Sequence, residues 1–461
     1  MNFSMRRMRA RFTLIKGKAK LVVTFILCTA LVLLVDHFLG LIAVILEKDF
    51  ESDFSYPLDV DNFPALIENF RNGDPVEFEP INRLYSRPKF LEKADSSCDE
   101  FKLMLIMIKS APRNLKRRNV IRSTWGHPQY LKNISNLIRT NKLVTSSNRI
   151  SIPKNHQEPN AVFKLVFLIG LISDEENDKL DVDSNDDDGA LGVGELSKSL
   201  KDTLPQDGVT EKQQLEKKLR LESTRYKDIV RIDTLDSYSN NTFKTMMGIR
   251  WASEVCTDFE YALVVDDDMF INFRNLLLFI ESPATYPDGE AEDSDSEPVG
   301  QIVDANRLFA GKVLFTKPIR QRIGSYSKWH LSLEEYPYNY FPRYMPAAAV
   351  VMSKQVVEDF YYASYYTKHF RFDDVFLGIM AYKMNIIPFS CSYFYVCHTD
   401  GGKCPGNIPP KKKRFIDGSE EDNNSEELTV VEQMEHVIAK HGLNSDQLID
   451  LWRELTLFGR I

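Results

Sequence analysis

The predicted fold depends on the stretch Phe259-Glu-Tyr-Ala-Leu-Val-Val-Asp-Asp-Asp-Met-Phe270. Its apolar part has the composition of a buried strand and ends at three consecutive carboxylates, here called the acidic triplet: Asp266, Asp267 and Asp268. A buried strand that stops at acids places them at the carboxyl edge of an open α/β sheet, where such folds bind ligands. Because alternate residues of an extended chain point the same way, Asp266 and Asp268 are expected to face one site.

Carboxylates that face one site repel each other unless a cation lies between them. A hard divalent ion with oxygen ligands, carrying a substrate diphosphate, would satisfy both Asp266 and Asp268. The alternative is a polar turn after a strand, which the triplet alone does not exclude.

Two further apolar runs predict strands that lie in the same sheet, at residues 103–108 and 162–172. A basic segment of helical character, residues 117–125, lies between them. Strand, helix and strand at this spacing predict a βαβ unit and hence an α/β fold with a parallel sheet. Later strands are expected at residues 228–232, 308–315 and 347–353, and helices at 211–225, 241–254, 430–441 and 448–455.

Length and charge limit the class of protein. The chain has 461 residues, of which 43% are hydrophobic, enough for one large domain or two with tails and insertions. The net charge is −8 although the first 20 residues carry only basic charges. The remainder is therefore strongly acidic, which argues against a nucleic acid as partner.

A long apolar run covers residues 21–46 and is interrupted by Asp36 and His37. Basic residues precede the run and acids follow it, which predicts a cytosolic amino terminus. A cleaved signal peptide is the alternative, but the run is long for one and no small-x-small cleavage site follows. We therefore expect an uncleaved signal-anchor that spans the membrane once.

The expected organisation has four parts: a cytosolic tail (1–20), a transmembrane signal-anchor (21–46), a stem (47–99) and a lumenal domain (100–461) with acidic insertions near 173–214 and 283–300. The first insertion contains Ser184-Asn-Asp-Asp-Asp-Gly-Ala-Leu-Gly-Val-Gly-Glu195, which partly matches a calcium loop. Its first position is serine instead of aspartate, so we interpret it as a solvated acidic insertion.

Cysteines and sequons agree with an oxidising compartment. Five cysteines follow the apolar run, and Cys391, Cys397 and Cys404 are close enough in sequence to predict one local disulfide. The sequence does not determine the pairing, and an odd number leaves one thiol free or bonded between chains. The candidate N-glycosylation sites are Asn133, Asn240 and Asn423.

Two later features are expected to join the acidic triplet. The pair Asp373 and Asp374 opens a predicted helix and offers a general base. Helix N-terminal charge is the alternative reading of that pair. His398 follows the last predicted strand and could complete a metal site, although a lone histidine is more often structural.

At this point the chain resembles a known family through six motifs that occur in its order. They are Arg117-Arg-Asn-Val-Ile-Arg-Ser-Thr-Trp-Gly126, Glu222-Ser-Thr-Arg-Tyr-Lys-Asp-Ile-Val230, Asp233-Thr-Leu-Asp-Ser-Tyr-Ser-Asn-Asn-Thr-Phe-Lys-Thr245, Asp266-Asp-Asp-Met-Phe270, Tyr340-Phe-Pro-Arg-Tyr344 and Phe372-Asp-Asp-Val-Phe-Leu-Gly378. The family is that of the β-1,3-galactosyltransferases, which includes β-1,3-N-acetylglucosaminyl- and N-acetylgalactosaminyltransferases. The resemblance covers roughly residues 101–398.

The resemblance implies a GT-A fold, a Rossmann-like and mostly parallel sheet, in a lumenal domain on a single N-terminal transmembrane helix. It implies a type II Golgi membrane protein that uses a UDP-sugar donor and Mn²⁺ or another divalent cation. The reaction implied is inverting: the acceptor hydroxyl attacks the anomeric carbon as UDP leaves, so a base and a cation are needed.

Residue roles follow from the motif positions. Asp374 matches the family's base, Asp268 matches the main metal ligand, and Asp266 and Asp267 lie toward ribose and metal. The resemblance assigns to the donor pocket three basic residues, for which a structural ion pair is the alternative: Arg118, Arg122 and Lys244.

Two positions depart from the family pattern. Asp373 stands where the family usually has glutamate. The run Met345-Pro-Ala-Ala-Ala-Val-Val351 replaces a glycine-rich stretch that usually ends in tyrosine. Alanine restricts φ and adds a methyl group where glycine lets backbone approach a substrate closely, so this run is expected to reshape the acceptor side or lower activity.

We therefore expect a Golgi β-1,3-glycosyltransferase that transfers galactose to a glycan on a glycoprotein or glycolipid. The nearest alternative transfers N-acetylglucosamine or N-acetylgalactosamine. An alternative of another class is a catalytically weak pseudo-transferase that binds glycans or partner enzymes at the membrane. A third, a calcium-binding lumenal protein, rests on the acidic insertion alone.

Overall fold

The computed structural model describes residues 20, 22–37, 39–55, 60–94, 102–140, 162–172, 210–287, 306–324, 326–396 and 434–459. The chain divides into two units, each described here by itself. The small unit comprises Met1–Ser55 and Phe315–Phe341, and the large unit comprises Tyr56–Leu314 and Pro342–Ile461.

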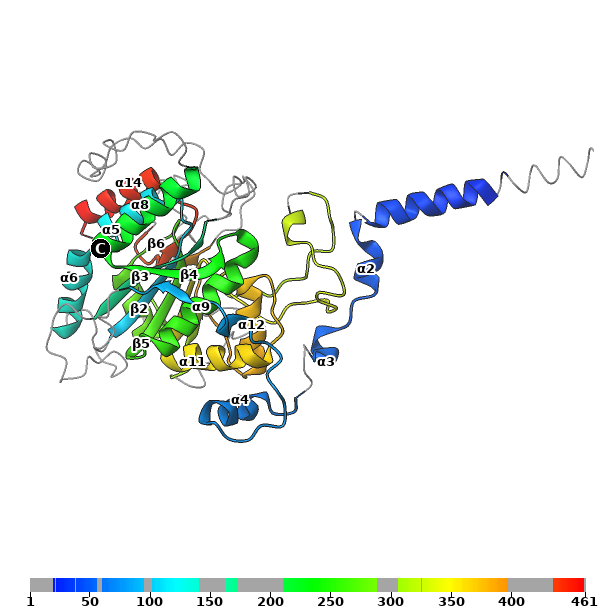
Figure 1. The fold of residues 1–461 in the computed structure, drawn as a ribbon, viewed down its shortest axis with the longest axis horizontal. Coiled ribbons are helices and arrows are strands. Elements are labelled where there is room, and N and C mark those ends of the chain that lie inside the picture. Colours follow the sequence, from blue (N-terminus) through cyan, green and yellow to red (C-terminus); the bar gives the residue numbers. More distant parts are fainter. Residues whose placement is uncertain are drawn as a thin grey trace, which may run out of the picture. The chain divides into compact units, whose positions relative to one another are not determined.

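The large unit is built on an eight-stranded, mostly parallel sheet with the strand order β1-β4-β3-β2-β5-β8-β7-β9 (Figure 1). Its four central parallel strands are β2 (Lys102–Lys109), β3 (Phe163–Leu171), β4 (Ile229–Leu235) and β5 (Phe259–Asp266). The predicted α/β class is confirmed, and the sheet fits the GT-A fold. The remaining strands are β1 (Phe90–Glu92), β7 (Phe309–Gly311), β8 (Ala349–Ser353) and β9 (Phe389–Ser390).

The centre of the sheet is buried on both faces. All eight residues of β2 are buried, which explains why this strand reads as a continuous apolar run instead of alternating. β2 pairs in parallel with β5, and the register sets Ile108 beside Val265 and Lys109 beside Asp266. The two strands therefore end together, with a lysine next to the first acid of the triplet.

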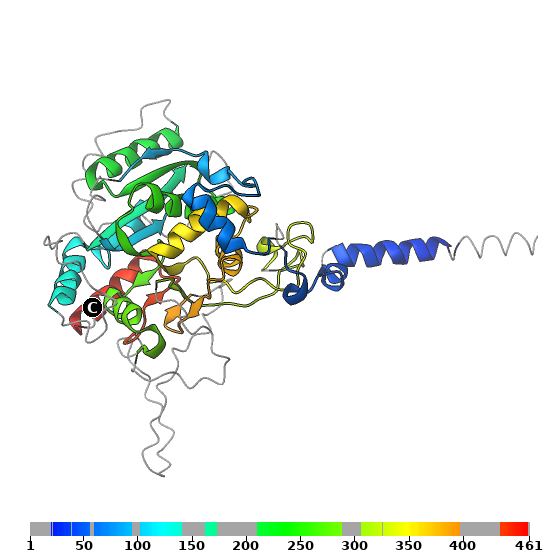
Figure 2. The ribbon, with the colours of Figure 1, turned by 90° about the horizontal axis from the view of Figure 1, so that it is seen from below.

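Helices cover both faces of this sheet. On one face α9 (Asn241–Glu254), α11 (Lys354–Ala363) and α12 (Asp373–Lys383) contact one another, and α9 also contacts β2, β3 and β4. The other helices of the large unit include α5 (Leu115–Ser123), α6 (Pro128–Arg139), α8 (Glu211–Tyr226), α10 (Phe273–Glu281) and α14 (Ser445–Leu457). The two views place α14 beside α5 and α6 (Figures 1 and 2), and Tyr130 of α6 meets Trp452 of α14 edge to face at 4.9 Å.

A second, three-stranded sheet brings the carboxyl-terminal segment next to the acidic triplet. β11 (Ala439–Lys440) lies between β10 (Phe394–Tyr395) and β6 (Phe270–Ile271). The expected helix over residues 430–441 is therefore wrong in its described part, which forms a turn followed by β11. Pairing with β6 outweighs the local helical pattern there. The last predicted helix is confirmed as α14, which begins with a capping box at Asn444.

Part of the segment predicted as stem packs in the large unit. It forms α4 (Phe63–Asn72), a short 3₁₀ helix (Leu84–Ser86) and β1, which extends the main sheet antiparallel to β4. Phe70 of α4 contacts the rings of Tyr362, Tyr365 and Tyr366, and Arg71 forms an ion pair with Asp359. These scattered aromatic contacts, which have no sequence period, order the segment.

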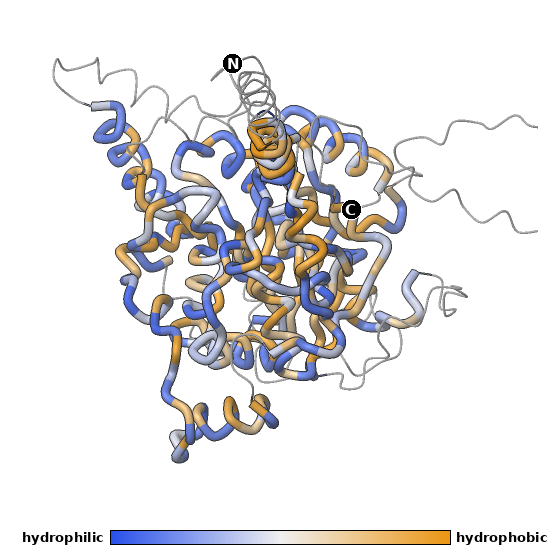
Figure 3. The backbone as a smooth tube through the Cα atoms, turned by 90° about the vertical axis from the view of Figure 1, so that its right-hand side faces the viewer, coloured by the Kyte–Doolittle hydropathy of each residue, from blue (hydrophilic) through white to orange (hydrophobic). Residues whose placement is uncertain are grey.

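The small unit begins with a helical stretch over residues 22–37, whose hydrophobic character is visible in Figure 3. Gly40 then adopts the left-handed conformation and separates this stretch from α2 (Leu41–Ile45). The unit also contains α3 (Phe50–Asp53) and a 3₁₀ turn at Ser327–Trp329. Within the described part of the chain, no helix combines the length and the apolar character needed to cross a membrane.

Several predicted features lie outside the described residues: the acidic insertions in most of their length, the calcium-like loop, His398, Cys397, Cys404 and Asn423. Cys256 is disulfide-bonded, and its partner also lies outside the described residues.

Candidate active site

The acids that the sequence singled out meet at the carboxyl edge of the central strands. Lys109, the last residue of β2, joins them: its Nζ lies 3.0 Å from Asp266 Oδ1 and 2.8 Å from Asp373 Oδ2. Burial alone would lower the pKa of this lysine, but the two carboxylates raise it above its ordinary value, so Lys109 is charged. The β2–β5 register and the start of α12 thus place both acid groups around one cation.

Asp373 is held in place by this lysine and by a neighbouring helix. It is buried and accepts hydrogen bonds from Lys109 Nζ at 2.8 Å and from Thr245 Oγ1 of α9 at 2.7 Å. Burial opposes its ionisation, but Lys109 and Thr245 lower its pKa below the ordinary value. The structure therefore places Asp373 as an ionised residue that positions α12.

Asp374, the next residue, has the properties of a general base. It is half-buried, and its Oδ1 accepts a hydrogen bond from the backbone N–H of Val375 at 2.7 Å. Burial and the negative charge of Asp373 raise the pKa of Asp374 to about 7. A base is most effective when its pKa is near the working pH, so the two adjacent acids are suited to different tasks.

Asp266 also carries a raised pKa. Burial raises it to about 6, against the opposing charge of Lys109 and with a contribution from Asp268. This carboxyl is tied to Lys109, which only partly balances its negative charge.

Asp267 is satisfied by protein donors. Ser110 Oγ donates at 2.6 Å, Asn114 Nδ2 at 2.9 Å and Arg117 Nη1 at 3.2 Å. Asp267 is buried and joins the end of β5 to the start of α5. Its contacts give it a role in holding the edge together.

Asp268 lies beside a histidine that sequence reasoning missed. Nε2 of His441, which directly follows β11, is 3.3 Å from Asp268 Oδ2. Burial would raise the pKa of Asp268, but the hydrogen bond and charge of His441 and the charge of Arg117 hold it below the ordinary value. The signal that could have found His441 was its place just before the capping box of α14; the helical pattern over 430–441 obscured it.

The surroundings of Asp268 fit a divalent cation. Its Oδ1 is buried and has no hydrogen-bond partner within the described residues. A carboxylate oxygen and an imidazole nitrogen are ligands that Mn²⁺ accepts. Across the described residues no group of three or more His, Cys, Asp and Glu side chains gathers closely enough to hold a metal. A cation here would therefore depend on other ligands such as substrate oxygens or water.

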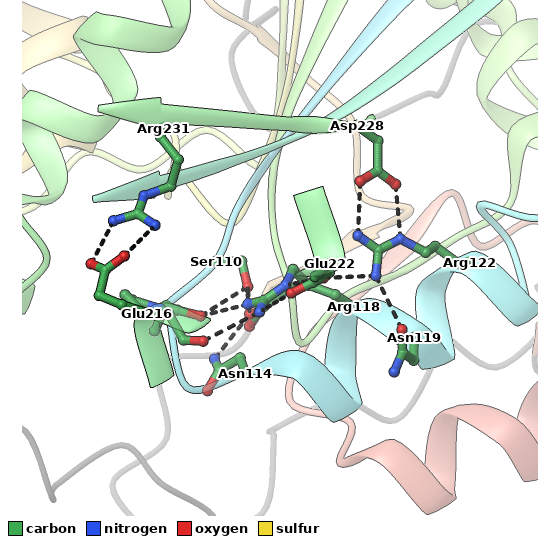
Figure 4. A network of polar contacts seen from close by, with 12 residues as sticks. Ser110, Asn114, Arg118, Asn119, Arg122, Glu216, Glu222, Asp228 and Arg231 are labelled. Carbon is green, nitrogen blue, oxygen red and sulfur yellow. Dashed lines mark hydrogen bonds and ion pairs between the residues drawn. The ribbon is translucent and has the colours of Figure 1, made fainter. Parts of the chain in front are cut away.

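The three basic residues assigned to the donor pocket are engaged in ion pairs, and Figure 4 shows those of Arg118 and Arg122. Arg118 is fully buried and uses all five of its N–H groups: two on Glu222 at 2.8 Å and the others on Ser110 Oγ and the carbonyls of Ala111 and Pro112. It has no donor left for a diphosphate.

Arg122 and Lys244 are likewise paired. Arg122 forms a bidentate pair with Asp228 at 2.8 Å and also contacts Glu222 (Figure 4). Lys244 Nζ lies 2.8 Å from Asp236 Oδ1. These contacts favour the structural ion-pair alternative, in which the basic residues shape the loops after the strands.

The alanine run lies directly against the acidic triplet. Ala347, Ala348 and Ala349 are buried, and Ala349 pairs with Val265 across β8 and β5. The backbone N–H of Asp266 donates to the carbonyl of Ala348 at 2.9 Å. The run therefore supports the backbone of the acid motif.

Two candidate glycosylation sites lie in the described residues. Asn133 is exposed on α6 and accepts a hydrogen bond from Gln129 at 3.0 Å. Asn240 caps α9, and its Nδ2 donates to the carbonyl of Leu235 at 3.0 Å. Asn240 is half-buried, so Asn133 is the more accessible of the two.

An open α/β sheet with acids at its carboxyl edge and a carboxylate of raised pKa at the start of a helix has a ligand site that is suited to a nucleotide sugar and to the deprotonation of a hydroxyl. Comparison with known proteins agrees. A family model described as Galactosyltransferase matches residues 208–392.

Three relatives illustrate the similarity. The β-1,3-galactosyltransferase brn of Drosophila melanogaster is 29% identical over 375 residues, which are 81% of this chain and 86% of the relative. A lactosylceramide 1,3-N-acetyl-β-D-glucosaminyltransferase of Xenopus tropicalis is 24% identical, over 68% of this chain and 62% of its own length. The human UDP-GalNAc:β-1,3-N-acetylgalactosaminyltransferase 1 is 28% identical, over 54% of this chain and 62% of its own length. The chain thus spans less than two thirds of the latter two relatives.

The chain is thus similar to β-1,3-glycosyltransferases that are named for the transfer of galactose, N-acetylglucosamine or N-acetylgalactosamine.

Proposed function

We propose that this protein transfers galactose from UDP-galactose to a hydroxyl of a glycan acceptor on a glycoprotein or glycolipid, with inversion and a β-1,3 linkage. The observation that carries the proposal is Asp374: a half-buried carboxyl with a pKa raised to about 7, one residue from the acid that Lys109 ties to the acidic triplet.

In this reaction Asp374 accepts the proton of the acceptor hydroxyl while the hydroxyl oxygen forms a bond to the anomeric carbon. The bond from that carbon to the diphosphate oxygen breaks, and UDP leaves with the electron pair. Lys109 and Asp373 fix the start of α12 and hence the position of the base. A bound Mn²⁺ ion, for which Asp268 and His441 are the candidate ligands, would supply charge neutralisation for the departing diphosphate.

Galactose is the proposed sugar because the matching family model and the Drosophila relative carry that name. N-acetylglucosamine and N-acetylgalactosamine are the alternatives, since other relatives are named for them. A catalytically weak pseudo-transferase is the alternative of another class, motivated by the alanine run at 347–349 next to the acid motif.

We also propose that the protein is a single-pass type II Golgi membrane protein with its catalytic unit in the lumen. The support is the basic tail, the apolar run over 21–46 and the exposed apolar side chains of its helical part, such as Phe25 and Leu27. The disulfide at Cys256 agrees with an oxidising compartment.

The first experiment is UDP release by the full chain with UDP-galactose, UDP-N-acetylglucosamine or UDP-N-acetylgalactosamine, Mn²⁺ and a mixed set of glycan acceptors. Release with UDP-galactose alone is expected in the wild type, and it should be lost in Asp374→Asn and Asp268→Asn. Asp450→Asn, the same change on an exposed residue of α14, is the matched control and should retain full activity.

A UDP-binding measurement separates the alternatives. Release with another donor would reassign the sugar. A folded wild type that neither releases UDP above the variants nor binds UDP in the presence of Mn²⁺ would favour the pseudo-transferase. Binding without release would show that the acceptor set lacks the right glycan.

A further inference from the structure

Arg320 joins two distant parts of the chain inside the small unit. Its guanidinium is buried, with Nε 2.7 Å from Glu47 Oε1, just after the apolar run. Its Nη groups donate to the carbonyls of Leu331, Ser332, Tyr336 and Tyr338 at 2.8 to 3.2 Å. One buried cation thus fixes the loop 320–338 to the residue that follows the apolar run.

The backbone strengthens this connection. The N–H of Lys48 donates to the carbonyl of Pro337 at 2.9 Å, and the N–H of Asn339 donates back to the carbonyl of Lys48 at 2.9 Å. Gly40 approaches the same loop so closely that a Cβ there would lie 2.4 Å from the carbonyl oxygen of Arg320. Residues 40–48 and 320–339 therefore form one compact body at the end of the apolar helix.

The apolar helix itself points to the environment of that body. Large side chains along residues 22–37 are exposed, among them Phe25 at 72%, Leu27 at 64% and Val32 at 61%. Exposed apolar surface on this scale is stable in hydrocarbon and not in water. The body that follows the helix would then lie at the boundary between lipid and water.

The loop presents side chains suited to that boundary. Ile323 and Tyr326 are exposed, at 46% and 49%. Tyr326 lies 5.8 Å from the ring of Trp329, over which Lys328 Nζ sits at 4.4 Å. The exposed cations of the loop are Lys317, Arg322 and Lys328. Tyrosine and tryptophan favour the membrane interface, and lysine and arginine favour anionic headgroups.

We propose that residues 317–324 and 326–329, with Ile323, Tyr326 and Trp329 as the apolar contacts and Lys317, Arg322 and Lys328 as the charged ones, bind the headgroup region of the lipid bilayer on the lumenal side, where the three cations meet lipid phosphates. This surface is a second membrane contact, beyond the anchor, and it rests on the proposed membrane anchoring. The exposed acids Glu334 and Glu335 lie in the next turn of the loop and mark the edge of the contact.

The test uses the full chain in nanodiscs of phosphatidylcholine and phosphatidylserine. Tyr326→Cys, in a Cys28→Ser background, carries an environment-sensitive fluorophore, and the labelled Cys28→Ser parent provides the blank. We expect blue-shifted emission that is quenched by lipids spin-labelled near the headgroup. Glu334→Cys, in the same loop but outside the contact, is expected to keep water-like, unquenched emission.

Charge gives a second readout. Replacing Lys317, Arg322 and Lys328 by glutamine, or omitting phosphatidylserine, should reduce the quenching of the fluorophore at position 326. Equal, water-like emission at both labelled positions would overturn the proposal. A change in the emission of the fluorophore at position 326 that depends on a glycan acceptor and not on lipid would also overturn the proposal.

A separate measurement tests whether the apolar run anchors the protein in the membrane. Carbonate extraction of membranes that contain the full chain reports on the apolar run alone. Extraction of the protein from the membrane would remove the basis of the proposal. Retention of the protein in the membrane, together with water-like emission of the fluorophore at position 326, would overturn only the lipid contact of the loop.

Discussion

Lys109 is the residue that connects the two acid groups of the site. It carries one buried charge between Asp266 and Asp373 and so links the end of β5 to the start of α12. The ion pairs of Asp266 and Asp373 with Lys109 could not be predicted from the sequence, because the lysine lies far from both acids in the chain. The candidate acids were found because they end a strand or begin a helix, which are local signals.

Replacing Lys109 by methionine should lower both stability and turnover. Removing one partner of a buried ion pair leaves uncompensated charge and costs about 3–5 kcal/mol. Chemical denaturation and UDP release under folding conditions check this. Lys354→Met, which breaks a partly exposed pair with Glu358 at 4.0 Å, should change the unfolding free energy by less than about 0.5 kcal/mol. Equal effects of the two changes would contradict the role given to Lys109.

The turnover rate of sugar transfer should rise as the pH increases through about 7. Asp374 must be deprotonated to accept a proton, and burial together with Asp373 raises its pKa to about 7. Turnover is therefore expected to fall roughly tenfold per pH unit well below that value. A pH–rate profile checks this, and a rate that stays constant from pH 5 to 7 would remove Asp374 as the base.

The same titration affects stability in the opposite direction. An acid whose pKa is higher in the folded state destabilises that state once it ionises, so the contribution of Asp374 should become less favourable as pH rises through about 7. In Asp374→Asn this part of the pH dependence of unfolding should be absent.

At the scale of elements, β11 completes the site. It pairs with β6, the strand immediately after the acidic triplet, and delivers His441 to Asp268. The parallel sheet, its buried central strands and the helix around residues 448–455 could be predicted, because apolar runs and amphipathic patterns are local signals. β11 could not, since two residues gain their strand conformation only from a partner far away in sequence. The ion pair of Arg118 with Glu222 also joins residues far apart in sequence, so the sequence alone could not identify this partner.

His441→Gln should weaken the response to Mn²⁺. Loss of a ligand or of its supporting partner typically costs about 10–100-fold in metal affinity or activity. Titrating UDP release and a spectroscopic Mn²⁺-binding signal with the metal checks this. His436→Gln, in the same segment, is the matched control. An unchanged Mn²⁺ dependence in His441→Gln would exclude the histidine as a ligand.

At the scale of the whole molecule, the chain forms two units, and the small one is assembled from segments that are remote in sequence. The sequence of the predicted stem has no hydrophobic periodicity from which this packing could be predicted. The small unit is held together by the buried Arg320, a few backbone hydrogen bonds and aromatic contacts, such as that between Phe54 and Tyr338 at 5.0 Å.

Glu47→Gln should loosen the small unit. The side chains of Glu47 and Arg320 are 7% and 2% exposed, so removing the carboxylate leaves a buried cation without its ion pair. Hydrogen exchange in residues 316–341 is expected to become faster, while exchange in β2 and β5 stays unchanged. Glu51→Gln, at an exposed position, should have no effect, and slow exchange in Glu47→Gln would show that Arg320 does not need its partner.

The pairing of β11 with β6 has a consequence for biosynthesis. The acidic triplet is translated long before His441, so a nascent chain already contains every motif of the family while the site still lacks its last side chain. A chain that ends prematurely before β11 would carry all six motifs and yet lack His441 beside Asp268. If the proposed role of His441 is right, such truncated chains should show a weakened response to Mn²⁺.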